Sequence, residues 1–167
     1  EVRDAWDYIP IGLTEDGTGN VGDATRDTLS ADIKIALDPL GIRGGRLEAD
    51  PQYYMSEIVD PFTGARRQIS EAKGWRGRAS LFLDRPGINS TFAVERVFGF
   101  HERAFRGDQI VTTIQRPFFI VWWEWSPRPT LSIRATANPL TSRQRDRNRH
   151  VYAGSRATGV LAFHEAR

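Results

Sequence analysis

Residues 29–37 read LSADIKIAL, and this stretch predicts the fold class. Its odd-numbered positions are apolar and its even-numbered positions are mostly polar: Leu29, Ala31, Ile33, Ile35 and Leu37 against Ser30, Asp32, Lys34 and Ala36. Successive side chains of a strand point to opposite faces, so a period of two predicts a strand with one apolar and one polar face. A helical period of 3.6 residues fits the stretch less well.

The same alternation recurs downstream. Three further predicted strands have the apolar faces Trp75, Gly77, Ala79, Leu81 and Leu83, then Phe119, Val121, Trp123 and Trp125, then Leu131, Ile133, Ala135 and Ala137. Between the first two, Phe92, Val94, Phe98 and Phe100 also align, but Arg96 interrupts them. A β-bulge or an outer face covered by protein would accommodate this arginine, and the pattern leaves both open.

Turn signals separate these segments at fairly regular intervals: Asp16-Gly17, Gly44-Gly45, Thr63-Gly64, Pro86-Gly87, Gly107-Asp108 and Pro127-Arg128-Pro129. The stretches between them are roughly 10 to 18 residues long, which is long for ordinary strands and normal for barrel strands. The sequence therefore predicts an all-β, antiparallel, up-and-down meander that is part of a large transmembrane β-barrel.

Composition narrows the function classes. The chain has 167 residues, of which 40% are hydrophobic and 26% charged, so it is neither a disordered chain nor a helical membrane protein. It has no cysteine, which excludes disulfides and thiolate chemistry, and its net charge of +2 gives little support for a nucleic-acid partner.

Alternation alone does not separate a membrane barrel from a soluble antiparallel sheet. Two features favour the barrel. Trp122, Trp123 and Trp125 precede the turn at Pro127, as in the aromatic girdles at a lipid boundary, and short connections alternate with longer, more polar ones. A core filled by tryptophans would explain the cluster equally well. On the barrel interpretation the lipid-facing residues are Leu29, Ile33, Ile35, Leu81, Leu83, Val121, Trp123, Leu131 and Ile133.

Several segments resemble the late barrel strands of proteobacterial TonB-dependent receptors. They are GNVGDATR (19–26), LDPLGIRGGRL (37–47), VDPFTG (59–64), RRQIS (66–70), and ANPL (137–140) with Arg143 and YAGSR (152–156). These motifs are structural, and none is a catalytic signature.

The resemblance implies a barrel of about 22 strands with a plug in its lumen. Residues 1–167 would form one partial barrel domain with roughly the last seven or eight strands, and the plug and the TonB box would be absent. It further implies a Gram-negative outer-membrane location, uptake of an unidentified scarce solute, and as partners outer-membrane lipid, lipopolysaccharide and, through the missing N-terminal part, the TonB complex. Turns near Pro39, Pro86 and Pro127 would face the periplasm, and loops near Thr63, Gly107 and Arg147 would face outward.

Catalytic and cofactor signatures are weak. His101, His150 and His164 lack metal-ligand spacing, and Ser155 is not in a G-x-S-x-G elbow. We therefore expect no enzyme activity, no cofactor and no metal. Two alternatives stay open: a soluble, lipocalin-like β module that binds a ligand, and, less favoured, an outer-membrane barrel enzyme.

Four alternating arginines form the one candidate binding stripe: Arg143, Arg145, Arg147 and Arg149. On an extended strand they would share one face and could contact lipopolysaccharide phosphates or another anionic ligand, because the guanidinium group binds such anions with two parallel hydrogen bonds. The simpler interpretation is a solvated strand extension with Asp146 offsetting part of the charge.

Overall fold

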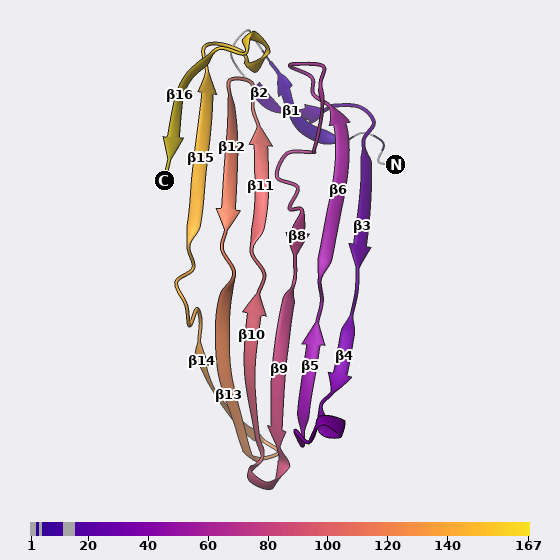
Figure 1. Ribbon diagram of the computed structural model, residues 1–167, viewed down its shortest axis with the longest axis vertical. Coiled ribbons are helices and arrows are strands. Elements are labelled where there is room, and N and C mark those ends of the chain that lie inside the picture. Colours follow the sequence, from indigo (N-terminus) through magenta and orange to yellow (C-terminus); the bar gives the residue numbers. More distant parts are fainter. Residues whose placement is uncertain (1–2, 4, 12–15) are drawn as a thin grey trace.

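The computed structural model describes residue 3, residues 5–11 and residues 16–167, and this part of the chain is antiparallel β-structure joined by short turns (Figure 1). The strands are β1 Trp6–Pro10, β2 Asp16–Asn20, β3 Thr25–Ser30, β4 Ile33–Ala36, β5 Gly45–Ala49, β6 Gln52–Val59, β7 Arg66–Arg67, β8 Trp75–Arg76, β9 Arg78–Arg85, β10 Ser90–Val97, β11 Phe100–Phe105, β12 Gln109–Gln115, β13 Phe118–Arg128, β14 Leu131–Ala137, β15 Arg145–Tyr152 and β16 Leu161–Ala166. Three 3₁₀ turns are η1 Asp38–Leu40, η2 Pro86–Ile88 and η3 Arg156–Thr158.

Most of these strands join end to end into longer ones, so the chain runs up and down the sheet (Figure 1). In the lower half the order is β4-β5-β9-β10-β13-β14; in the upper half β3 pairs with β6 and β6 with β8, and a second run has the order β11-β12-β15-β16. Backbone hydrogen bonds at mid-height, such as Asp50 N to Arg78 O and Phe98 N to Gly77 O, connect neighbouring strands between the halves. The predicted all-β antiparallel meander is confirmed, but no pairing joins its two edges within the described residues, so the sheet is open.

The connections lie at two ends. η1, η2 and the tight turn between β13 and β14 lie together at the lower end, whereas the connections at 60–74, 106–108 and 153–160 lie at the upper end (Figure 1). The predicted outer loop near Arg147 is wrong, because Arg147 lies inside β15 and pairs with Thr113 of β12. The polar composition of this segment predicted a loop, but its backbone hydrogen-bonds to β12 and β16 and so forms a strand.

The strand register places apolar side chains on one face of the lower sheet. Ile35, Leu47, Leu81, Val94 and Val121 are cross-strand neighbours in one row. One residue away, the neighbouring row on the opposite face contains Lys34, Glu48, Ser80, Glu95 and Ile120. The period of two in the sequence is thus realised as one apolar and one largely polar face.

The sheet bends toward its polar face. A cavity of about 380 Å³ on this face is lined both by Lys34 of β4 and by Arg134 of β14, which are the two edge strands of the lower sheet. In a flat sheet of six strands these edges would lie about 24 Å apart, too far to line one small cavity. The polar face is therefore concave and the apolar face convex.

The alternation of side chains between the two faces shifts by one residue at one place in the long strand formed by β10 and β11. It shifts again at the matching place in the neighbouring strand formed by β12 and β13. Glu95 and Glu102 both line the concave side although seven positions separate them, an odd number that places residues of a regular strand on opposite faces. Residues 98–99 and 116–117, left out of the strands, lie between the pairs Val97–Phe118 and Phe100–Gln115 and absorb this change.

This break corrects one sequence prediction. Phe92 and Val94 lie on the convex face with Arg96, but Phe100 lies on the concave side, where the Lys73 ammonium group approaches its ring. Gly99 permits the break, since a Cβ atom there would lie 2.3 Å from the carbonyl oxygen of Gln115.

The buried apolar cluster of the described residues is small. Ala5, Ala24 and Ile58 form it at the upper end, with Val21 and Ile69 packed against them. Many large apolar side chains are instead exposed on the convex face, among them Ile35, Leu81, Phe92, Val94 and Ile133. In the described residues, most large apolar side chains of the sheet are therefore outside a central core.

Candidate functional site

The convex face carries an exposed apolar band. All nine residues predicted from the sequence to face lipid share this face through the strand register: Leu29, Ile33, Ile35, Leu81, Leu83, Val121, Trp123, Leu131 and Ile133. Leu29 is 70% exposed and Leu81 and Ile133 are each 45% exposed. The eight-residue pairing of β10 with β13 extends about 26 Å along the strands, close to the height of the apolar band of a transmembrane barrel.

Aromatic side chains mark two levels of this band. Near the lower turns, Trp123 stacks with Trp125 at a ring-centroid distance of 6.5 Å and with Phe92 at 6.3 Å. Farther up, Tyr53 contacts Trp75 at 4.9 Å. The aromatic side chains therefore lie at two heights of the convex face, with aliphatic side chains between them.

Trp122 does not belong to the aromatic cluster to which its sequence position assigns it. It lies on the concave face, where its indole nitrogen donates a 2.6 Å hydrogen bond to Glu95 Oε1. The Arg134 guanidinium lies 4.1 Å from the Trp122 ring centroid and also pairs with Glu124 at 2.9 Å. Trp122 therefore lies on the opposite face from Trp123 and Trp125, as strand geometry requires.

The lower concave face is a network of paired charges. Glu95 lies 3.8 Å from Arg78, which also contacts Asp50 at 3.3 Å. These side chains line the cavity of about 380 Å³ together with Lys34 and Trp122. These charged groups are thus paired with one another across neighbouring strands of the concave face.

The upper concave face contains a second cavity, of about 440 Å³, with an excess of arginine. Arg106, Arg145 and Arg147 line it with Glu71 and Glu102. Arg145 pairs with Glu102 at 3.1 Å, whereas the Arg147 side chain makes no hydrogen bond or ion pair with the described residues. An unpaired guanidinium beside a hollow is suited to bind an anionic group.

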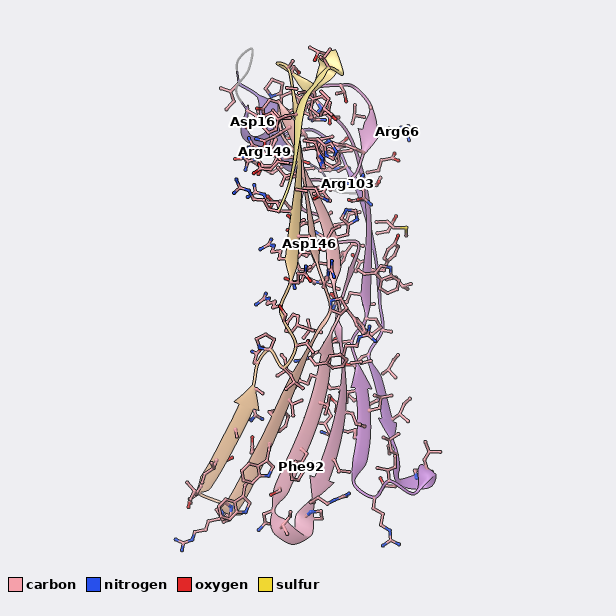
Figure 2. All side chains as sticks on the ribbon, turned by 60° about the vertical axis from the view of Figure 1, so that its left-hand side comes forward. Asp16, Arg66, Phe92, Arg103, Asp146 and Arg149 are labelled. Carbon is pink, nitrogen blue, oxygen red and sulfur yellow. The ribbon has the colours of Figure 1, made fainter. Side chains whose placement is uncertain are left out.

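Three of the four predicted stripe arginines share a face. Arg145, Arg147 and Arg149 alternate along β15 on the concave side, and Arg149 lies on the same side of β15 as Asp16 of β2 (Figure 2). Arg149 bonds Gln109. Arg143 is not part of this stripe, because it precedes β15 and its guanidinium lies over the Phe118 ring at 5.3 Å.

A buried charge cluster at the upper end was not identified from the sequence. Asp60 Oδ2 accepts hydrogen bonds from Arg67 Nε at 2.7 Å and Arg156 Nη2 at 2.8 Å, and Arg67 Nη1 donates to Asp7 Oδ2 at 2.8 Å. The side chains of Asp60, Arg67 and Arg156 are 1%, 7% and 6% exposed. The cluster joins the β1–β2 hairpin to the connections at 60–74 and 153–160. The sequence contains no short-range signal for it, because its members lie far apart along the chain.

Burial raises the pKa of Asp60, but the hydrogen bonds from the Phe62 amide, Arg156 and Arg67 lower it by more. The net pKa of Asp60 is therefore below its ordinary value, and the carboxylate stays ionised in the acid range.

The three histidines do not form one cluster. His101 lies on the exposed convex side of β11, whereas His150 and His164 face each other across β15 and β16 with ring centroids 4.5 Å apart. Ser155, considered as a nucleophile, accepts the Ala157 amide hydrogen bond that begins η3. Groups of three or more His, Cys, Asp or Glu side chains that could hold a metal are absent from the described residues.

In the described part of the chain, no helix is long and apolar enough to cross a membrane. Comparisons with protein-family models, curated proteins and solved structures give no match.

Proposed function

We propose that this chain forms part of the wall of a TonB-dependent receptor, a transport barrel in the outer membrane of a Gram-negative bacterium that takes up a scarce solute. The observation that carries the proposal is the distribution of side chains on the curved sheet. Exposed Leu, Ile, Val and Trp side chains dominate the lower convex face, where the Arg96 guanidinium lies over the Phe119 ring, and paired charged groups line the concave face.

The energetics of solvation support this assignment. Leaving a Leu, Ile or Val side chain fully exposed to water is less favourable, by a free energy of about 1.5–3 kcal/mol, than placing it in an apolar environment. Acyl chains provide that environment on the convex side, and water in a lumen solvates Lys34, Glu48 and Arg78 on the concave side. A soluble monomer rarely exposes so extended an apolar surface.

The alternatives make different demands on the same sheet. A lipocalin-like module binds its ligand against apolar side chains inside a small closed barrel, whereas here the concave side is polar. A barrel enzyme requires a nucleophile beside a base, and Ser155 instead caps a turn. The polar concave side therefore favours a role in binding and transport.

The concave position of Arg145, Arg147 and Arg149 bears on the ligand. Lipopolysaccharide lies outside a barrel, so these arginines are better placed to contact an anionic solute or protein segment in the lumen. Lipid and lipopolysaccharide remain the proposed partners of the convex face.

Site-directed labelling tests the orientation of the sheet. The chain contains no cysteine, so single cysteines can be placed in the full-length protein at Val94 and Val121, and at their neighbours Glu95 and Ile120. Nitroxide labels at Val94 and Val121 are expected to collide with oxygen dissolved in lipid, and labels at Glu95 and Ile120 with a water-soluble nickel complex. Equal exposure of all four labels to the nickel complex would contradict the proposal.

Cell fractionation and uptake complete the test. The full-length protein is expected in the outer-membrane fraction and to require detergent for extraction, and solute uptake is expected to stop when the proton-motive force is collapsed. Recovery in the soluble fraction would support the lipocalin-like alternative. Hydrolysis lost on replacement of a single serine would support the enzyme.

A further inference from the structure

His150 and His164 lie directly opposite each other on neighbouring antiparallel strands. Reciprocal hydrogen bonds between Arg147 and Arg167, N to O at 2.8 and 2.9 Å, make that pair a hydrogen-bonded one. Hydrogen-bonded and non-hydrogen-bonded pairs alternate along an antiparallel ladder, so His150–His164, three positions farther along, is a non-hydrogen-bonded pair. Side chains of such pairs approach each other most closely.

The two imidazole rings are stacked and have no other partner. Their centroids are 4.5 Å apart and their planes are inclined by 28°. Neither ring makes a hydrogen bond or ion pair with the described residues. The adjoining positions on the same face hold uncharged side chains, Ile110 of β12 opposite His150 and Asn148 on β15, so no neighbouring carboxylate or guanidinium competes for the ring nitrogens.

We propose that His150 and His164 form a two-histidine site for a divalent transition-metal ion of the Cu²⁺, Ni²⁺ or Zn²⁺ class on the convex side of the β15–β16 pair. Imidazole nitrogen is a preferred ligand of these ions. Each histidine supplies one nitrogen after its ring turns about the Cβ–Cγ bond, a torsion with a broad energy minimum. Water completes the coordination shell, since no third His, Cys, Asp or Glu of the described residues joins the pair.

Such an ion would link β15 to β16. An ion that binds only when the two strands are paired stabilises that pairing in proportion to its concentration. The site therefore connects metal availability to the attachment of the last described strand. It does not depend on the membrane assignment, because the geometry follows from the pairing of these strands alone.

The test uses Cu²⁺ and untagged full-length protein in detergent. Titration followed by electron paramagnetic resonance measures both the affinity and the number of nitrogen ligands. Wild type is expected to show two nitrogen ligands. Because the second ligand binds intramolecularly, His150→Ala and His164→Ala should each lower the affinity at least about tenfold and leave one nitrogen or none.

His101→Ala is the matched control, since His101 is also exposed on the convex side but has no histidine partner. It should bind Cu²⁺ like wild type. His101 and His164 are exposed and His150 is half-buried, and none of the three makes a hydrogen bond or ion pair with the described residues. Alanine at these positions should therefore change stability little, and circular dichroism should show all three variants folded. Wild-type affinity and spectrum in His150→Ala and His164→Ala, or an equal loss in His101→Ala, would overturn the proposal.

Discussion

Replacing Asp60 by asparagine should destabilise the upper end of the sheet by about 3–5 kcal/mol at pH 7, the usual effect of breaking a buried ion pair. The Asp60 carboxylate is 1% exposed and receives four hydrogen bonds, from the Phe62 amide, from Arg67 and twice from Arg156. Asparagine retains one acceptor oxygen, but its amide group would face a guanidinium donor. Two buried cations would lose their shared anion.

A surface pair provides the control. Arg66 and Glu57 approach to 2.8 Å, as closely as Arg156 and Asp60, but their side chains are 77% and 51% exposed. Water screens this pair, so Glu57→Gln should cost about 0–1 kcal/mol. The two ion pairs have the same N–O distance and differ in burial, so a difference between the two variants reports the effect of burial.

The pH dependence supplies a second, independent readout. The folded-state pKa of Asp60 lies below its unfolded value, so its contribution is complete above about pH 4 and is lost as pH falls through the folded pKa. Asp60→Asn lacks this contribution at every pH. The difference in unfolding free energy between wild type and variant should therefore be largest near neutrality and shrink below pH 4.

Urea unfolding of the full-length protein in detergent, followed by tryptophan fluorescence at pH 7 and pH 3, measures these quantities. The reasoning is refuted if Asp60→Asn and Glu57→Gln have the same effect. It is also refuted if the gap between wild type and Asp60→Asn is unchanged at pH 3.

Two further predictions concern the lower sheet and the strand break. On the proposed orientation, Ala137→Arg, opposite Val121 on the convex face and away from the aromatic level, should destabilise the protein by about 2–4 kcal/mol, whereas Thr136→Arg, one position along on the concave face, should be nearly neutral in the same urea titration. Gly99→Ala should lower the thermal unfolding midpoint because its Cβ atom would overlap the carbonyl oxygen of Gln115, whereas Gly87→Ala, with open space around it, should not; equal midpoints would contradict the close contact.

Local alternation was sufficient to predict the strands and their faces wherever the backbone is regular. The stretch 29–37 and the strands around Leu81, Val121 and Ile133 all present the predicted apolar side. In these segments the face on which a residue lies depends only on whether it is an odd or even number of positions from a residue of known face. That number is read directly from the sequence.

The remaining features depend on contacts between distant segments. Phe100 was assigned to the wrong face because one irregular step inverts the alternation, and no residue type specifies that step uniquely. The cluster around Asp60 joins residues nearly a hundred positions apart. His150 and His164 meet only because β15 and β16 pair in one register, so spacing along the chain could not reveal their proximity.

The coupled irregularities at residues 98–99 and 116–117 limit how these strands can evolve in length. Deleting Gly99 alone would turn Glu102 to the convex side and His101 to the concave side, while the facing strand kept its present orientation. A matching loss beside Pro117 would be needed to restore agreement. Homologous chains should therefore gain or lose residues at these two places together, and an indel confined to one of them should be rare.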